Sequence, residues 1–339
     1  MAGRDIVVIG GSAGAVDAVI ELVRGLPADL PAAVFVVIHF PTDASSVLPK
    51  ILNRAGALAA RHAVDGEPVC PGIIYVAPPN RHMLLGDGRV RLSRGPKENG
   101  VRPAIDPLFR TAATAYGPRV IAALLSGNLD DGTIGLRRVK ESGGMALVQD
   151  PRDALYPGML RSAIEHVEVD QVVPLNRMSE VIARLVGENS EEDRMADDHP
   201  GPDPEREVQL QDRQVQPGTP STQTCPECHG TLWEVEDGDI AHFRCRIGHA
   251  FTAESLYAQQ SDELEAALWT ALRALEEHAA LSRRMAARAQ AGERARSSAV
   301  FTERALDAEH HAAVIRRVLE AGFQHPAAEP VPSPEEPAA

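Results

Sequence analysis

The stretch Ile6-Val-Val-Ile-Gly-Gly-Ser-Ala-Gly14 decides the fold, and an amphipathic pattern, Ala15–Gly25, follows it directly. Four consecutive apolar residues before a glycine are typical of a parallel strand that helices bury on both faces. The glycines allow a sharp turn, so that Ser12 lies at the carboxyl end of the strand and at the start of a helix. This G-x-S-x-G pattern between a strand and a helix predicts an exposed serine nucleophile.

Two other interpretations of this turn stay open at this point. A glycine-rich turn after a first strand can bind a dinucleotide. However, the spacing here is not G-x-G-x-x-G, and His39 follows the second strand, where a ribose-binding acid is expected. A serine at the start of a helix can also act only as its cap, through a hydrogen bond to a free backbone amide.

The alternation of apolar runs and amphipathic stretches continues to about residue 186. A helix is predicted over Ser45–Ala55, and the Gly-Asp-Gly within Leu84–Leu92 predicts a peripheral hairpin. Four more apolar runs predict buried strands: Val34–Ile38, Ile73–Val76, Val120–Leu125 and Met145–Val148. Strands that alternate with helices favour an α/β domain over residues 1–186, with a doubly wound, mainly parallel sheet.

Polar side chains follow two of these other strands. His39 comes directly after its strand, and Asp130 and Asp131 follow Val120–Leu125 within a few residues. Because the carboxyl ends of parallel strands meet at one edge of a sheet, we expect these side chains near Ser12. There His39 can act as a general base and an aspartate can orient its imidazole. Spacing alone does not choose between the two aspartates, and three histidines compete with His39: His62, His82 and His166.

Composition excludes several classes of protein. The 339 residues carry a net charge of −14, which disfavours broad contact with a nucleic-acid backbone. No apolar run approaches the roughly 20 residues that a membrane span needs. The first residues lack the basic region and cleavage site of a secretory signal. We therefore expect a cytoplasmic protein that neither inserts into a membrane nor binds nucleic acid.

The pattern changes after residue 186. Residues 187–223 are rich in acidic residues, proline and glycine and lack apolar periodicity, which predicts a disordered linker. Residues 253–323 return to helical spacing and predict a helical hairpin, which we interpret as an interaction or self-association element, a solvated stalk being the simpler alternative. Residues 324–339, rich in proline, glutamate and alanine, predict a disordered tail.

Three of the four cysteines lie close together within residues 224–252. Cys225 and Cys228 form C-x2-C, and after a gap of sixteen residues Cys245 and His249 form C-x3-H. This spacing is typical of a small zinc-ribbon-like module, in which four protein ligands leave no open position and zinc is structural. Alternatives for the fourth ligand are His229 and His242, and a redox C-x-x-C is the competing interpretation. Catalysis itself is expected to need no cofactor.

Residues 1–186 resemble the catalytic domain of the chemotaxis protein-glutamate methylesterases, the CheB family. The matching stretches recur in the family's order: Ile9–Gly14, Val37–Pro41, Ile74–Pro78 with Arg81-His82, Arg102–Phe109, Ser126–Gly135 and Pro157–Met159. The resemblance implies a Ser-His-Asp triad on a doubly wound sheet, which maps to Ser12, His39 and Asp131. Asp131, directly before Gly132, is selected by this resemblance alone.

The resemblance also implies a function. The chain is expected to hydrolyse glutamate γ-methyl esters on the methylated helical signalling domains of chemoreceptor-type proteins, and to deamidate glutamine there. Because the catalytic strand begins near residue 6, we expect no receiver domain before it. The alternative is a non-enzymatic signalling adaptor that binds receptors or other partner proteins.

The chain departs from the family pattern in three places, and the changes around Ser126–Leu129 motivate that alternative. The segment Ser12-Ala-Gly-Ala15 replaces Ser-Thr-Gly-Gly, and Ser126-Gly-Asn-Leu129 replaces Thr-Gly-Met-Gly. Val101 stands where the family has a histidine. All three lie near the expected substrate region, so they bear on substrate preference more than on the triad.

Overall fold

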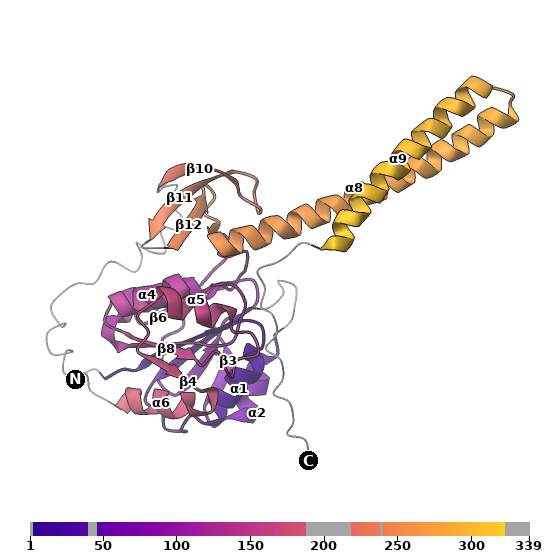
Figure 1. Cartoon of the computed structure of the whole chain (residues 1–339). Coiled ribbons are helices and arrows are strands. Elements are labelled where there is room, and N and C mark those ends of the chain that lie inside the picture. The colour runs from indigo at the N-terminus through magenta and orange to yellow at the C-terminus, as the bar shows by residue number, and fades with distance from the viewer. Residues whose placement is uncertain (1–2, 40–45, 188–217, 238–239, 323–339) are drawn as a thin grey trace, which may run out of the picture. The chain divides into compact units, whose positions relative to one another are not determined.

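The computed structural model describes residues 3–39, 46–187, 218–237 and 240–322 (Figure 1). The chain separates into two compact units, one that reaches Leu256 and a second over Tyr257–Pro326. Most of the linker expected over residues 187–223, and the tail expected over residues 324–339 in full, lie outside the described residues.

The first unit contains a seven-stranded parallel sheet in the order β3-β4-β2-β1-β7-β8-β9. Its strands are β1 (Ile6–Gly11), β2 (Ala33–Ile38), β3 (Ala59–His62), β4 (Ile73–Val76), β7 (Val120–Leu124), β8 (Met145–Gln149) and β9 (Gln171–Val173). The chain builds outward from β1 first on the β2 side and later on the β7 side. The prediction of a doubly wound parallel sheet is therefore confirmed, and the short strands β3 and β9 are additions to it.

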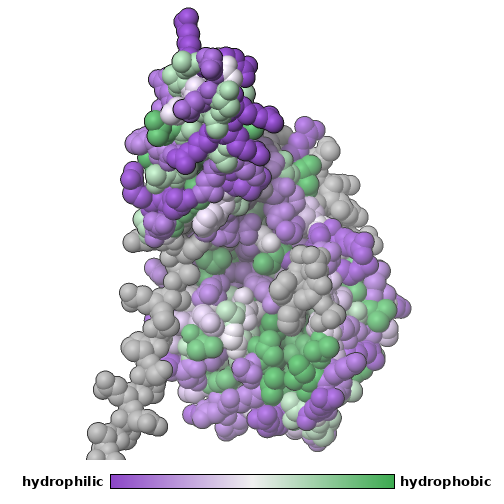
Figure 2. All heavy atoms as spheres, turned by 90° about the vertical axis from the view of Figure 1, so that its right-hand side faces the viewer, coloured by the Kyte–Doolittle hydropathy of each residue, from purple (hydrophilic) through white to green (hydrophobic). Residues whose placement is uncertain are grey.

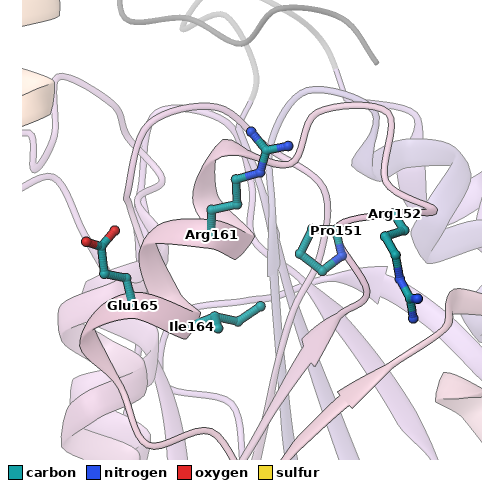
Figure 3. A pocket seen from close by; sticks show the side chains of 5 residues that line it. All are labelled: Pro151, Arg152, Arg161, Ile164 and Glu165. Carbon is teal, nitrogen blue, oxygen red and sulfur yellow. The ribbon is translucent and has the colours of Figure 1, made fainter. Parts of the chain in front are cut away.

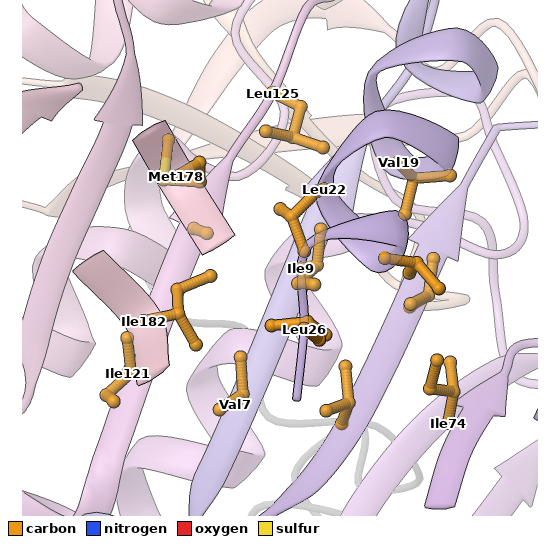
Figure 4. Close-up of a cluster of buried hydrophobic side chains, with 14 of the residues drawn as sticks. Val7, Ile9, Val19, Leu22, Leu26, Ile74, Ile121, Leu125, Met178 and Ile182 are labelled. Atoms are coloured by element: carbon orange, nitrogen blue, oxygen red, sulfur yellow. The ribbon is translucent and has the colours of Figure 1, made fainter. Parts of the chain in front are cut away.

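Helices cover both faces of this sheet, as Figure 1 shows. One face packs against α1 (Ala15–Arg24), α2 (Leu48–Ala55) and α6 (Leu175–Gly187), and the other against α3 (Ile105–Tyr116), α4 (Thr133–Glu141) and α5 (Gly158–His166). Side chains alternate along each strand, so Val7 and Ile9 enter the first core (Figure 4) while Ile6 and Val8 enter the second. This two-sided burial explains the uninterrupted apolar runs in the sequence.

The expected peripheral hairpin is formed by β5 (His82–Gly86) and β6 (Arg89–Ser93). Its two turn residues have positive φ angles, 50° at Asp87 and 70° at Gly88. Asp-Gly is a preferred pair for such a two-residue turn, since its backbone twist matches that of the flanking strands.

A four-stranded antiparallel sheet follows, with β10 (Thr219–Thr224), β11 (Thr231–Asp237), β12 (Ile240–Cys245) and β13 (Ala250–Thr252). Strand β10 corrects the sequence analysis, because most of it falls in the segment expected to be a linker. Five of its six residues are exposed, so the apolar alternation that marks a half-buried strand is missing. Pairing with β11, at the edge of the sheet, is what makes it a strand.

Two long helices, α8 (Ala253–Ala291) and α9 (Ala295–Ala321), form the predicted helical pair. They run antiparallel, since Arg283 pairs with Glu309 and Arg316 with Glu276. Several of the residues buried between them are alanines, which let the two backbones approach closely. At the surface of this unit, apolar side chains are interspersed among polar ones (Figure 2). Among the described residues, no helix is long and apolar enough to cross a membrane.

Packing at α1 gives a stability prediction. Leu22 is fully buried between α1 and the sheet (Figure 4), so Leu22→Ala removes apolar contacts and leaves a cavity. The free energy of unfolding of the Leu22→Ala variant, measured by urea denaturation, should be about 2–5 kcal/mol lower than that of the wild type. The neighbouring exposed Glu21 provides the control, since Glu21→Ala should change it by less than about 0.5 kcal/mol. Equal effects of the two substitutions would contradict this packing.

Candidate active site and metal cluster

Three neighbouring strands end at one edge of the sheet, and a predicted catalytic side chain follows each. Ser12 follows β1, His39 follows β2, and Asp131 lies in the loop after β7. Strand β1 pairs with both β2 and β7, so the three strand ends lie side by side. The sheet reverses its winding direction between β1 and β7, and ligands of open α/β sheets bind at such a switch point.

The three side chains form one hydrogen-bonded series. His39 Nδ1 lies 3.0 Å from Ser12 Oγ, and His39 Nε2 lies 2.7 Å from Asp131 Oδ2. An ionised carboxylate can only accept, so Nε2 carries the ring proton and donates it to Asp131. The lone pair of Nδ1 then faces the hydroxyl of Ser12 and can accept its proton. The structure thus brings together all three residues of the expected triad.

Among the described residues, the backbone after Ser12 leaves the amide of Ala13 available as a donor. The amide of Ser12 donates to the carbonyl of Ser126 over 2.9 Å, and Gly14, with φ of 74°, begins α1. Within the described part of the chain, no acceptor bonds the amide of Ala13. This amide lies next to the nucleophile and at the amino end of α1, where partial positive charge accumulates.

Asp131 is buried, and four donors bond its carboxylate. Oδ2 accepts from His39 and from the amide of Ile105 (2.7 Å), and Oδ1 accepts from Asn99 Nδ2 (3.0 Å) and the amide of Asp106 (3.3 Å). Burial raises the pKa of Asp131, but the interactions with His39, Ile105 and Asn99 outweigh it, so the pKa falls below its ordinary value. Two of the donors open α3, whose dipole also favours a negative charge here. Asp131 therefore stays ionised.

Two further buried carboxyl groups lie beside Asp131 and behave differently. Burial, followed by the charge of Asp131, raises the pKa of Asp106 well above its ordinary value. Asp130 accepts a hydrogen bond from Thr252 Oγ1 over 2.7 Å, whereas His39 bonds Asp131. Burial raises the pKa of Asp130 to about 7. Of the two aspartates that spacing left open, Asp131 is the one that contacts His39.

The competing histidines lie elsewhere. His82 is fully buried and bonds the carbonyl of Pro96 through Nε2 over 2.9 Å, and burial lowers its pKa. His62 Nε2 lies 3.1 Å from a backbone carbonyl, and His166 ends α5. In the part of the chain that the structure describes, His39 is the histidine that bonds Ser12.

The loop after β7 carries one of the three departures from the family pattern, Ser126–Leu129. A Cβ on Gly127 would lie 2.1 Å from Met159 Sδ and 3.0 Å from Ser12 Cβ, so a side chain here would displace Met159 and crowd the nucleophile. Leu129 has φ of 62°, a conformation that favours the glycine found there in the family pattern. Asn128 Oδ1 is buried and has no hydrogen-bond partner among the described residues. The residue before it, Gly127, is the one that lies beside Ser12.

Two residues of the site were missed by the sequence analysis. Asn99 precedes Gly100, so it resembles an ordinary turn residue, and no periodicity marks it. Asp106 lies in a stretch of the family resemblance, but the sequence does not show that its carboxyl group is buried beside Asp131. Both contact the triad through hydrogen bonds between distant segments, which a sequence pattern does not reveal.

The predicted metal ligands also come together. Cys225, Cys228, Cys245 and His249 place their ligand atoms within 4.8 Å of one another. Cys225 Sγ lies 3.7 Å from His249 Nδ1, Cys245 Sγ lies 3.6 Å from the same nitrogen, and the thiols of Cys228 and Cys245 are 3.6 Å apart. His249 therefore supplies the nitrogen of the cluster, for which the sequence left His229 and His242 open.

A pocket of about 520 Å³ lies apart from these residues. Its lining comes from the loop after β8 and from α5, as Figure 3 shows: Pro151, Arg152, Arg161, Ile164 and Glu165. Arg152 is engaged by Asp150 in an ion pair of 2.6 Å. Because no residue of the triad lines the pocket, we assign it no part in the chemistry.

Among α/β proteins, a serine, histidine and aspartate bonded in series at the switch point are typical of serine hydrolases. A more specific assignment comes from residues 7–182, which match the CheB methylesterase family. The chain belongs to this family. The four-stranded sheet and the long helices lie outside the matched residues.

Two relatives support the assignment to the CheB methylesterase family. The chain is 39% identical over 181 residues to protein-glutamate methylesterase/protein-glutamine glutaminase 2 of Anaeromyxobacter dehalogenans, covering 53% of each chain. It is 36% identical over 186 residues to the corresponding protein of Symbiobacterium thermophilum, covering 55% of this chain and 51% of that one. The chain thus spans about half the length of these curated relatives.

A solved structure agrees with this assignment. The crystal structure of the Thermotoga maritima CheB methylesterase catalytic domain is 35% identical in sequence to this chain. It superposes with a TM-score of 0.52, covering 55% of this chain and 100% of that domain.

The raised pKa of Asp130 gives a prediction for stability against pH. The native state keeps a proton on Asp130 up to pH 7, whereas the unfolded state loses it near the usual pKa of 3.8. This contribution to stability is therefore full below about pH 4 and lost as the pH rises to about 7. Asp130→Asn cannot ionise, so its free energy of unfolding should exceed that of the wild type by about 2–4 kcal/mol at pH 8.

Urea denaturation at pH 4, 6 and 8 measures this difference, which should vanish at pH 4. The exposed Asp29 offers a matched control, since Asp29→Asn should follow the wild type at every pH. A constant difference between Asp130→Asn and the wild type across the three pH values would show that the proton is not involved.

Proposed function

We propose that the chain is a protein-glutamate methylesterase that hydrolyses glutamate γ-methyl esters on the helical signalling domains of chemoreceptor-type proteins, with deamidation of glutamine as a second reaction. The observation that carries the proposal is the hydrogen-bonded series from Ser12 through His39 to Asp131. Membership of the CheB methylesterase family and the printed activities of the relatives support the choice of substrate.

In the first half of the reaction, Ser12 Oγ attacks the ester carbonyl and forms a new C–O bond while His39 Nδ1 takes the hydroxyl proton. Asp131, which stays ionised, stabilises the imidazolium through the hydrogen bond to Nε2. Collapse of the tetrahedral intermediate breaks the bond to the methoxy group, which leaves as methanol with the proton from His39. The glutamate is then esterified to Ser12.

In the second half, water attacks the acyl carbonyl and gives a proton to His39, which returns it to Ser12 Oγ as the C–O bond to the enzyme breaks. The product is the glutamate γ-carboxylate. On glutamine the same sequence breaks a C–N bond and releases ammonia. The free amide of Ala13 is positioned to donate to the oxyanion, supported by the amino end of α1.

The test uses a methylated receptor signalling domain whose mass is followed by mass spectrometry. The wild type should remove one methylene mass per ester, and Ser12→Ala should slow this by about three orders of magnitude or more. A matched serine substitution, Ser261→Ala on α8, should leave the rate unchanged. If the folded wild type removes no methyl group, the alternative is favoured, namely a signalling adaptor. Its motivation is the altered loop after β7, with Asn128 and Leu129.

The second part of the proposal concerns the Cys/His cluster, which would hold a structural zinc ion. Zinc bonds of about 2.3 Å to sulfur and about 2.0 Å to nitrogen give tetrahedral edges of about 3.5–3.8 Å. The separations of 3.6–3.7 Å between ligand atoms fit this geometry. Cys225 directly follows β10, before the turn into β11, and Cys245 ends β12, so one ion would join the strands of the small sheet.

Elemental analysis tests this part. The purified full-length chain should contain one zinc ion per molecule, and Cys225→Ser and Cys245→Ser should each lose most of it because three ligands bind zinc far less tightly. Cys70 lies outside the cluster, so Cys70→Ser is the control and should keep its zinc. A wild-type chain purified without chelator that contains almost no zinc would contradict the proposal.

The helical pair is proposed as a binding element for a partner or for a second copy of the chain. Large apolar side chains on α8 are exposed, among them Leu264, Trp269 and Leu281. Exposed side chains of this kind are enriched at protein interfaces when they cluster.

A further inference from the structure

One buried asparagine joins the catalytic acid to the small sheet. Asn99 donates through Nδ2 to Asp131 Oδ1 (3.0 Å) and to Asp106 Oδ2 (3.2 Å). Its Oδ1 accepts from the amide of Thr252 (3.2 Å) and from the hydroxyl of Ser255 (3.0 Å). Both ends of the side-chain amide are therefore occupied, one by the acids of the α/β domain and one by β13 and the first turn of α8.

Backbone hydrogen bonds also join the loop of Asn99 to the small sheet. The amide of Asn99 donates to the carbonyl of Ala250 over 2.8 Å, and the amide of Ala250 donates to the carbonyl of Lys97 over 3.3 Å. An ion pair of 2.6 Å joins Lys97 to Glu227, which lies between Cys225 and Cys228. Asn99 has φ of 52°, an uncommon conformation that surrounding contacts must hold. The first residue of β13 and the C-x2-C turn thus fix the loop that carries Asn99.

The small sheet also contacts the neighbouring acid. Thr252 Oγ1 donates to Asp130 Oδ1 over 2.7 Å and lies 2.9 Å from the hydroxyl of Ser255. Thr252 and Ser255 are each only 1% exposed, so water does not replace these bonds. Both residues of the acid pair after β7 are therefore connected to Thr252, one directly and one through Asn99.

These bonds determine which way the amide of Asn99 faces. Its NH₂ group must face Asp131, because a carbonyl oxygen in that place would repel the carboxylate. The amide of Thr252 and the hydroxyl of Ser255 require an oxygen on the other side. Without these two donors, Oδ1 of Asn99 would be a buried acceptor without a partner, and the orientation that supports Asp131 would lose its stabilisation.

The metal cluster is directly connected to this contact. His249 precedes Ala250, the residue that pairs with Asn99, and the amide of Cys245 bonds the carbonyl of His249 over 3.0 Å. A metal ion on Cys245 and His249 would fix the turn that leads into β13. Loss of the ion would release that turn, and with it the position of Thr252.

From this network we infer that the Cys/His module is a metal-dependent positioning element for the catalytic acid: Thr252 and Ser255 orient Asn99, Asn99 holds Asp131 in place for His39, and metal occupancy of the module sets the rate of hydrolysis. The inference rests on the proposed function of Ser12, His39 and Asp131. It assigns regulation to the part of the chain that lies outside the family match.

The test measures the reactivity of Ser12 without a receptor substrate. A fluorophosphonate probe forms an O–P bond to an activated serine and releases fluoride, and mass spectrometry of the full-length chain gives the rate of labelling. Thr252→Val and Ser255→Ala should slow labelling by about 10- to 100-fold, because a small displacement of the acid misplaces the imidazole. The exposed Thr270 and the partly exposed Ser261 on α8 supply matched controls, since Thr270→Val and Ser261→Ala should label at the wild-type rate.

Two further measurements separate positioning from loss of structure. Thr252→Ser keeps the hydroxyl, so it should restore most of the labelling rate that Thr252→Val loses. On the methylated receptor domain, Thr252→Val should lower kcat and leave KM within about twofold, because Thr252 is buried and acts on the catalytic acid through Asn99. A Thr252→Ser variant as slow as Thr252→Val would contradict the role of the hydroxyl.

A double-mutant cycle tests whether the metal acts through Asn99. Cys225→Ser and Asn99→Ala should each slow labelling, and the combined variant should be hardly slower than either, because both remove the same support. Additive effects of the two substitutions would show that the metal does not act through Asn99. Zinc-free or Cys225→Ser protein that labels at the wild-type rate would overturn the inference and leave the proposed function standing. Wild-type protein that is folded and zinc-loaded but is not labelled at Ser12 would overturn both.

Discussion

The buried charge of Asp131 is the constraint on which the site depends. A carboxylate removed from water is costly unless hydrogen bonds replace its hydration, and here four donors do so. They come from the end of β2, from the start of α3 and from the loop that carries Asn99. The elements around the carboxyl edge of the sheet therefore have to meet at one point. Because Asp131 is fixed by these donors, it fixes His39, and His39 in turn activates Ser12.

The same constraint explains why three acids within one small volume take different states. Asp131 has the histidine and most of the donors, so it holds the charge. Asp106 shares Asn99 with it and is driven towards its neutral form by burial and by the charge of Asp131. Asp130 lies on the other side of the loop, where Thr252 is its partner. Because the three acids differ in this way, one negative charge, that of Asp131, contacts the imidazole. This charge stabilises the positive form that His39 takes during the reaction.

Local patterns in the sequence predicted the central part of this structure. The strand, turn and helix from Ile6 to Gly25 were predicted because apolar runs and glycines act over a few residues. The positions of Ser12 and His39 at one edge followed from the parallel arrangement, and the ligand set of the metal cluster was predicted from its spacing. Each of these predictions depends either on a pattern within one segment or on the rule by which parallel strands are connected.

The remaining parts depend on contacts between distant segments. The choice of Asp131 over Asp130 depends on how the loop after β7 turns, which adjacent identical residues do not reveal. Strand β10 is polar and exists because β11 pairs with it, and β3 and β9 are too short to show a period. Asn99, Thr252 and Ser255 are polar residues without periodicity, and their bonds cross about 150 positions of the chain.

The contact between Asn99 and β13 has a consequence for the history of the chain. The side-chain amide of Asn99 bonds two different segments. Replacing either Asn99 or its partners alone therefore leaves a buried polar group without a hydrogen bond. A substitution at position 99 therefore requires a matching substitution at position 252 or 255. Among chains that carry this module, positions 99, 252 and 255 should change together, whereas in family members without it the equivalent of position 99 is released from that partnership.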